Sequence, residues 1–299
     1  MIATECTNLD KADKRMTLQL PDYSHFTNNP IYRAATGHLL DLAGSADGRA
    51  VIDLACGTGA CSLCLLERYT VAELILADPD KDALVYAQEL CSVPSRTFCI
   101  SAEQLPSVIP KNAADIVIVG NAVHLFSDIG AAARGIRHCL RPGGVVVLST
   151  AFHVDAAGDD EHAFIRSVFV EALRTLRGTA KARREESSRD SSARTHLRAA
   201  EVEASLADAG LVGIEMSERG FLLDGNFYSG FVATREFASA ALPGYPPALA
   251  AEALSRGALR VAGAHPSRGV FERRWLYARA FVPADDADRN TEESRLPGR

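Results

Sequence analysis

The sequence lacks the segments that would carry a chain into or across a membrane. No apolar run in the 299 residues approaches the roughly 18–20 residues that a membrane-spanning helix needs. The first residues, MIATECTNLDKADKRM, are polar and include three acidic side chains, so they have no apolar stretch of the kind found in secretory signals. We therefore expect no membrane association and a cytoplasmic location.

An excess of basic residues is also missing. The 32 lysines and arginines are outnumbered by 38 aspartates and glutamates, which gives a formal net charge of −6. Enzymes that act on nucleic acid usually present a basic face, so this balance argues against a nucleic-acid partner. The apolar share of 47% is sufficient for a full hydrophobic core, and the length suits one domain with an appended cap.

Cysteine is absent after Cys139, and the seven cysteines up to that point are an odd number. This distribution fits reduced thiols better than a disulfide framework. Cys61 and Cys64 have a C-x-x-C spacing, but a zinc or redox site would normally need a second cysteine pair or nearby histidines. We interpret both as core residues and expect no metal.

What the sequence does contain is a regular alternation of strand and helix patterns. Short, apolar, β-branched runs predict five strands, at residues 49–55, 73–78, 96–101, 114–121 and 144–151. Helical patterns separate these runs, and further strands are expected within 211–223 and at 273–282. Such an alternation predicts an α/β fold with a parallel, doubly wound sheet.

The strongest local signal is AVIDLACGTGACS, residues 50–62. A strand ends in an acid-containing turn, and Gly57 and Gly59 flank a small residue before a helix. Glycine lets a ligand approach the backbone closely, and the start of the next helix offers free N–H groups. The dinucleotide fingerprint needs a third glycine where Ser62 stands, so an NAD oxidoreductase is the least favoured alternative.

This segment resembles the first motif of the class I S-adenosylmethionine (SAM)-dependent methyltransferases, with Ala55 where glycine is common. Four further segments follow in the family's order and spacing: LADPD, ISAEQLP, DIVIVGNAVHLFSD and LRPGGVVVLS. The resemblance covers residues 32–151 clearly and 197–282 more loosely. It implies SAM as the cofactor and a Rossmann-like sheet of seven strands, mostly parallel with one antiparallel, plus helical cap insertions.

The resemblance also assigns the cofactor contacts. Asp53 and the glycine loop would face the methionine part of SAM. Asp78, at the end of the second strand, would accept both ribose hydroxyl protons, and helix N-capping is its structural alternative. Ser101 would meet the adenine amino group as a neutral partner. The predicted cofactor residues are Asp53, Ala55, Gly57, Gly59, Asp78, Pro79, Ser101, Ala102 and Asn121.

Two histidines are candidate bases. His153 follows the fifth predicted strand, and ligands of doubly wound sheets bind beyond the carboxyl ends of the strands. A neutral imidazole there could take a proton from a hydroxyl or amine acceptor. His124 is the second candidate. Their structural alternatives are an exposed loop histidine for His153 and a histidine at the start of a helix for His124.

Helical segments at about 156–198 and 224–272 are expected to build an acceptor pocket. An apolar cap with scattered aromatic side chains suits a small hydrophobic acceptor of the natural-product type. Within the first segment, the mixed-charge stretch 181–198 is interpreted as a solvated loop, with a mobile lid as the alternative. The candidate pocket residues are Phe164, Phe227, Tyr228, Phe231 and Tyr245.

The predicted organisation is a flexible arm at 1–20, a methyltransferase domain at 21–282 with its cofactor core at about 30–151, and a disordered tail at 283–299. The expected reaction is methyl transfer from SAM by in-line displacement, in which the protein mainly aligns the acceptor and excludes water. The alternatives are a SAM-binding enzyme that catalyses another step, such as a cyclisation, and a protein or RNA methyltransferase. A homodimer is left open.

Overall fold

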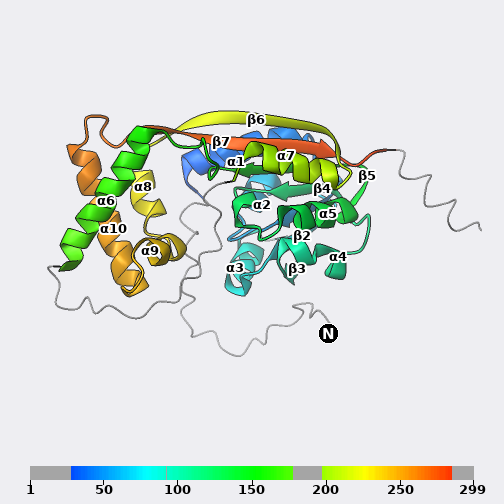
Figure 1. Ribbon diagram of the computed structural model, residues 1–299. Helices are drawn as coiled ribbons and strands as arrows, with labels where there is room; N and C mark the ends of the chain where they lie inside the picture. The colour runs from blue at the N-terminus through cyan, green and yellow to red at the C-terminus, as the bar shows by residue number, and fades with distance from the viewer. Residues whose placement is uncertain (1–27, 92, 178–196, 285–299) are drawn as a thin grey trace, which may run out of the picture. The chain divides into compact units, whose positions relative to one another are not determined.

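The computed structural model describes residues 28–91, 93–177 and 197–284. These residues form one seven-stranded sheet and a set of helices, which divide into two compact units (Figure 1). The first unit consists of Met1–His153, Arg194–Glu218 and Leu276–Arg299, and the second consists of Val154–Ala193 and Arg219–Trp275. The predicted arm at 1–20, and nearly all of the loop at 181–198 and of the tail at 283–299, lie outside the described residues.

The sheet has the strand order β3-β2-β1-β4-β5-β7-β6. Strands β1 to β5 pair in parallel, and β7 runs antiparallel to β5. This confirms the predicted fold class, a Rossmann-like sheet that is mostly parallel. The strands are β1 Ala50–Leu54, β2 Glu73–Asp78, β3 Ser95–Cys99, β4 Ala114–Val119, β5 Leu140–Thr150, β6 Val212–Leu223 and β7 Phe271–Phe281.

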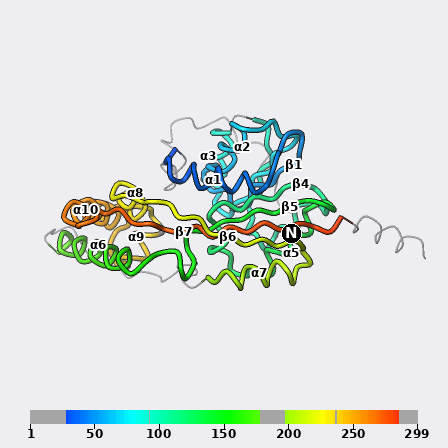
Figure 2. The backbone as a smooth tube through the Cα atoms, turned by 90° about the horizontal axis from the view of Figure 1, so that it is seen from above, coloured from blue at the N-terminus to red at the C-terminus, as the bar shows by residue number. Residues whose placement is uncertain are grey.

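Helices of the first unit cover both faces of this sheet. Figure 2 shows α1, α2 and α3 on one face and α5 and α7 on the other. The helices are α1 Pro30–Ala43, α2 Ala60–Leu66, α3 Lys81–Cys91, α4 Leu105–Val108, α5 Ile129–Cys139 and α7 Ala199–Asp208, with short 3-10 turns η2 Ala102–Gln104 and η3 Val123–Leu125. The chain runs from β1 outward to β2 and β3 and then crosses back to β4 on the other side of β1. The carboxyl ends of β1 and β4 therefore form the switch point at which such sheets bind ligands.

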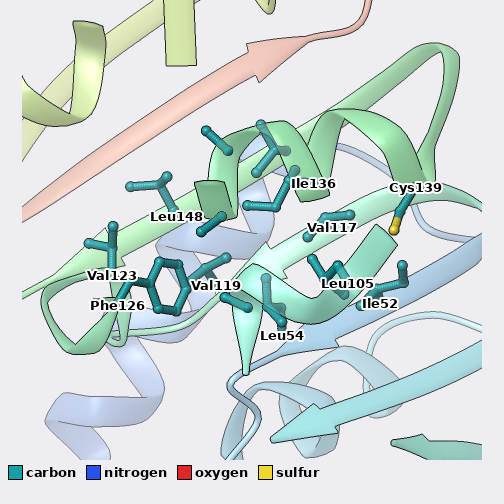
Figure 3. Close-up of a cluster of buried hydrophobic side chains, with 14 of the residues drawn as sticks. Ile52, Leu54, Leu105, Val117, Val119, Val123, Phe126, Ile136, Cys139 and Leu148 are labelled. Carbon is teal, nitrogen blue, oxygen red and sulfur yellow. The ribbon is translucent and has the colours of Figure 1, made fainter. Parts of the chain in front are cut away.

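Alternation along β1 explains how an acidic residue sits in the middle of a buried strand. Ile52 and Leu54 point into a hydrophobic cluster with Val117 and Val119 of β4, on the face covered by α5 (Figure 3). Successive side chains of a strand point to opposite faces. Asp53 therefore points to the other face, where α2 packs.

The structure corrects one boundary that the sequence predicted. Strand β5 begins at Leu140, not at residue 144, so the segment RPGG lies within the strand and is not a turn. Leu140 pairs with Ala114, and a register shift follows before the pair formed by Ile116 and Val145. An irregularity of this kind absorbs the proline and the glycines, which would otherwise disfavour a central strand.

The second unit is mainly helical, in agreement with the helical pattern predicted over 224–272. Its helices are α6 Asp159–Arg177, α8 Gly225–Phe231, α9 Arg235–Ala241 and α10 Pro247–Ala264. Helix α10 packs against α6, α8 and α9. Gly257 permits the close approach of α10 to α6, because a Cβ there would lie 3.1 Å from the carbonyl oxygen of Val168.

Candidate active site

The loop between β1 and α2 has three left-handed residues in alternation. The φ angles are 54° at Ala55, 50° at Gly57 and 83° at Gly59. Glycine adopts this conformation at little cost, whereas an L residue such as alanine is strained there. The alternation turns the chain sharply from the end of β1 into the first turn of α2, for which Gly59 is the N-cap residue.

The two glycines of this loop have different surroundings. A Cβ added at Gly57 would meet no atom within 4 Å, so the space beside it is open. A Cβ at Gly59 would lie 3.0 Å from the Cβ and 3.1 Å from the Cα of Ala87, on α3. Gly57 therefore fits the predicted close approach of a ligand, while Gly59 is needed for the packing of the loop against α3.

Asp53 is a buried carboxylate with one occupied and one unoccupied oxygen. It is 1% exposed, and Ser62 donates its hydroxyl to Oδ2 over 2.6 Å. Oδ1 is buried and has no hydrogen-bond partner among the described residues. Burial raises the pKa of Asp53 to about 7, although hydrogen bonding from Ser62 opposes this rise. An unpaired buried acceptor of this kind is suited to a polar or cationic ligand group.

Asp78, at the carboxyl end of β2, ties two loops together. Its Oδ2 accepts the N–H of Gly57 over 2.8 Å, and its Oδ1 accepts the N–H of Asp80 over 2.8 Å. Burial raises the pKa of this carboxyl, and the two backbone hydrogen bonds counteract the rise. A carboxylate has about four lone-pair sites, so both oxygens retain capacity for a ligand hydroxyl.

The alternative role for Asp78, capping of the next helix, belongs to Asp80. The Asp80 carboxylate accepts the N–H groups of Asp82 and Ala83, at 2.9 and 3.1 Å. Pro79, between the two aspartates, is exposed, and its carbonyl oxygen accepts from the Cys99 thiol. Asp78 therefore shapes the glycine loop and does not begin α3.

Ser101 and Ala102 lie at the start of η2, after β3. Ser101 forms a capping box with Gln104, in which the Gln104 side chain accepts the Ser101 N–H over 2.9 Å. The neighbouring Glu103 is half-buried and accepts from Ser127 at the end of the loop after β4. Burial opposes ionisation of Glu103, but its hydrogen bonds outweigh this and lower its pKa to about 2.

Asn121 joins the carboxyl ends of β4 and β5. Its φ is 53°, a conformation that asparagine tolerates better than most residues. Its backbone N–H donates to the Ser149 hydroxyl over 3.0 Å, and its side-chain oxygen accepts the N–H of Ala151 over 2.7 Å. The segment after β4, which contains the predicted cofactor residue Asn121, is thus fixed to the end of β5.

His124 is buried in η3 and held by Thr150. The Thr150 hydroxyl lies 2.9 Å from His124 Nδ1 and also accepts the N–H of Phe152 over 2.9 Å. Thr150 is fully buried, so its hydroxyl proton needs an acceptor, and Nδ1 is the acceptor that the described contacts provide. A hydrogen bond donated by Thr150 to Nδ1 would correspond to the tautomer with the proton on Nε2.

His153 lies after β5 and is 7% exposed, so it is not the exposed loop histidine of the alternative interpretation. Glu218 Oε1 lies 3.9 Å from its Nδ1. This distance is too long for a hydrogen bond, and the pair carries opposite charges only when the imidazole is protonated.

The five aromatic candidates belong to the helical unit. Phe164 and Tyr228 are 1% exposed and pack against each other and against Phe271, as an interior cluster. Phe227 is buried, and Phe231 and Tyr245 are half-buried. A buried ion pair lies in the same unit, because Arg273 binds Glu161 through two nitrogens, at 2.8 and 2.7 Å.

Residues 51–144 match the protein family described as a methyltransferase domain. The match spans β1 to the start of β5 and includes the glycine loop, Asp78 and Asn121. It confirms the resemblance to the SAM-dependent methyltransferases and the prediction of SAM as the cofactor. In the described ranges, no helix combines the length and the apolar character needed to cross a membrane.

Solved structures share the fold at low identity. The YcgJ protein of Bacillus subtilis has 18% identity and a TM-score of 0.54, over 84% of this chain and 98% of its own. The [4+2]-cyclase SpnF has 17% identity and a TM-score of 0.50, over 84% and 81%. Phosphoethanolamine N-methyltransferase 2 of Haemonchus contortus, solved with phosphomonomethylethanolamine and S-adenosylhomocysteine, has 13% identity and a TM-score of 0.51, over 84% and 53%.

The fold and the family match agree. Residues 51–144, within the Rossmann-like unit, are similar to SAM-dependent methyltransferases.

Proposed function

We propose that the protein transfers the methyl group of SAM to a small, hydrophobic organic acceptor. The observation that carries this proposal is the glycine loop with its two carboxylates. Asp78 holds the N–H of Gly57, Asp53 keeps one buried oxygen unpaired, and the space beside Gly57 is open. Backbone N–H groups, a carboxylate for a cation and a carboxylate for hydroxyls are what the parts of SAM require.

These residues assign the cofactor contacts as follows. The unpaired Oδ1 of Asp53 binds the charged amino-acid end of SAM, and Asp78 accepts the ribose hydroxyls. The η2 segment with Ser101 and Ala102 meets the adenine, and Asn121 borders the methyl group. When bound, SAM supplies a methyl carbon activated by a positively charged sulfur. The protein aligns the acceptor atom with that carbon and excludes water.

His153 is the proposed base for an acceptor that carries a hydroxyl or an amine. It is buried beyond the carboxyl end of β5, with Glu218 Oε1 3.9 Å from its Nδ1. The imidazole of His124 is in contact with the Thr150 hydroxyl, and we assign it a structural role. A small apolar acceptor is suggested by the aromatic composition of the helical unit. A cytoplasmic location and a homodimer remain predictions.

An acceptor screen with methyl-labelled SAM tests this proposal. Incubation with phenols, carboxylic acids, amines and thiols should give labelled product and S-adenosylhomocysteine with at least one small acceptor class. Label that enters added protein or RNA, and no small acceptor, would assign the other methyltransferase branches.

A second candidate reaction is a cyclisation that leaves SAM unchanged. It is supported by the likeness to the [4+2]-cyclase SpnF, which has the same fold. In that case SAM would bind, no S-adenosylhomocysteine would form, and a polyunsaturated substrate would be converted with SAM still intact. The same screen therefore separates the two reactions.

A further inference from the structure

Ser62 is a buried hydroxyl that the cofactor contacts described above do not include. It lies in the first turn of α2, is 0% exposed, and donates to Oδ2 of Asp53 over 2.6 Å. The distance is within the range of a hydrogen bond to an ionised acceptor. Because Ser62 occupies Oδ2, the other oxygen of the same carboxylate is the one that stays available.

The charged group that acts on Asp53 from a neighbouring strand is another carboxylate, whereas Arg33 and Arg68 act on the Cys64 thiol. Asp78 on β2 adds a negative charge, and the nearby thiols come from the loop after β1, from α2 and from α3. These thiols are Cys56, Cys61, Cys64 and Cys91. Burial raises the pKa of each thiol, so all four are neutral at physiological pH.

The ionised form of a carboxylate in such surroundings is not stabilised by a protein cation, so a bound cation has a large effect on its ionisation. Burial has brought the pKa of Asp53 to about 7, within the range in which small changes decide its charge. An ammonium group close to Oδ1 would favour the ionised form, and the Ser62 hydroxyl favours it as well. Loss of either partner would favour the protonated form.

We propose that Ser62 is a positioning residue of the cofactor site, which favours the ionised form of Asp53 and directs its free oxygen to the ammonium group of SAM, so that cofactor binding completes the ionisation of Asp53 and releases a proton. This inference rests on the proposed function and adds that pH regulates cofactor binding. Asp53 gives its proton to solvent as the cofactor binds, and the ammonium group replaces that proton as the positive partner. Cofactor affinity is therefore coupled to pH through one buried hydrogen bond.

Calorimetric titration with S-adenosylhomocysteine, which retains the ammonium group, tests this inference between pH 6 and pH 8. The affinity of the unmodified protein should rise about tenfold over this range, as an acid with a pKa near 7 ionises. Titrations at pH 6.5 in buffers of different ionisation enthalpy should show net proton release. With Ser62→Ala the rise should move to higher pH, and affinity at pH 7 should fall at least about fivefold.

Three controls separate positioning from a structural effect. Ser62→Thr keeps the hydroxyl and should restore the original pH profile. Ser95→Ala removes another buried serine hydroxyl, at the start of β3, and should leave the profile unchanged. The third control is 5′-methylthioadenosine, which lacks the amino-acid part, so its affinity should respond neither to pH nor to Ser62→Ala.

Two results would overturn the inference while leaving the proposed function intact. One is an affinity for S-adenosylhomocysteine that is constant from pH 6 to pH 8 with no proton release. The other is a loss in Ser62→Ala that is equal for both ligands at every pH, since this would show a structural role only. If neither ligand bound at any pH, the proposed function would itself be refuted, and the inference with it.

Discussion

Ala55 offers a test of how the glycine loop is built, because it is an alanine in a left-handed conformation. Its φ of 54° costs an L residue roughly 1–2 kcal/mol relative to a right-handed conformation. In Ala55→Gly this strain disappears. Against that, the unfolded chain gains freedom worth roughly 0.4–1 kcal/mol, and a half-buried methyl worth less than about 0.8 kcal/mol is lost. Together these effects give a change between about 0.8 kcal/mol of destabilisation and about 1.6 kcal/mol of stabilisation, with a midpoint near 0.4 kcal/mol of stabilisation.

The informative quantity is the difference in the free energy of unfolding between this substitution and an alanine-to-glycine substitution at a right-handed helical position. Ala204 is an exposed alanine within α7, and Ala204→Gly should destabilise the protein by about 1 kcal/mol. Both substitutions remove the same atoms, so the contrast between them reports the left-handed strain. Equilibrium urea unfolding of both variants measures it, as a shift of midpoint at constant m value. If both variants were destabilised equally by about 1 kcal/mol, Ala55 would not be strained and the loop geometry would be wrong.

Three further predictions follow from the site. Gly57→Ala should fold but bind SAM at least about tenfold more weakly in calorimetry. Gly59→Val should instead lose thermal stability, because its side chain would collide with α3. A normal melting temperature of Gly59→Val would contradict this packing. Asp53→Asn should stabilise the protein more at pH 8 than at pH 5. In the unmodified protein the raised pKa of Asp53 lowers the free energy of unfolding by up to about 4 kcal/mol as pH rises from about 4 to about 7, and asparagine has no such titration. Equal shifts of the melting temperature at both pH values would refute this prediction. His153→Gln should reduce kcat by about 10²-fold or more with SAM affinity intact, while His124→Gln, which keeps a donor, should reduce it far less; equal losses would remove His153 as the base.

The sequence was sufficient for the parts of the fold that short segments determine. β1, β2 and β4 are nearly continuous apolar runs, and short runs of that kind favour strands covered on both faces. The glycine loop was predictable because its left-handed residues require small side chains. The start of β5 was not predictable, because Arg141 to Gly144 have the composition of a turn. They lie between the Leu140–Ala114 and Val145–Ile116 pairs, and Gly143 and Gly144 bond to Val282, which is distant in sequence.

Contacts between distant residues were the part of the site that the sequence could not give. Glu103 binds Ser127 across 24 positions, and no local pattern marks such a pair. The burial of His153 and its approach to Glu218 depend on how β6 is placed, which the sequence leaves open. The hydrogen bond from Ser62 to Asp53 spans nine positions, and the strand-to-helix connection with alternating side chains could have indicated it.

The central claim is that the loop between β1 and α2, together with Asp78, holds SAM, and calorimetry on Asp78→Ala tests it most directly. Losing a charge-assisted contact to the ribose should cost about 1.5–3 kcal/mol, which corresponds to roughly a 10- to 150-fold loss of affinity. Asp80→Ala is the matched control, because it removes the cap of α3 two residues away and should lower stability by about 1 kcal/mol with SAM affinity unchanged. A folded Asp78→Ala protein that binds SAM as tightly as the unmodified protein would contradict the account.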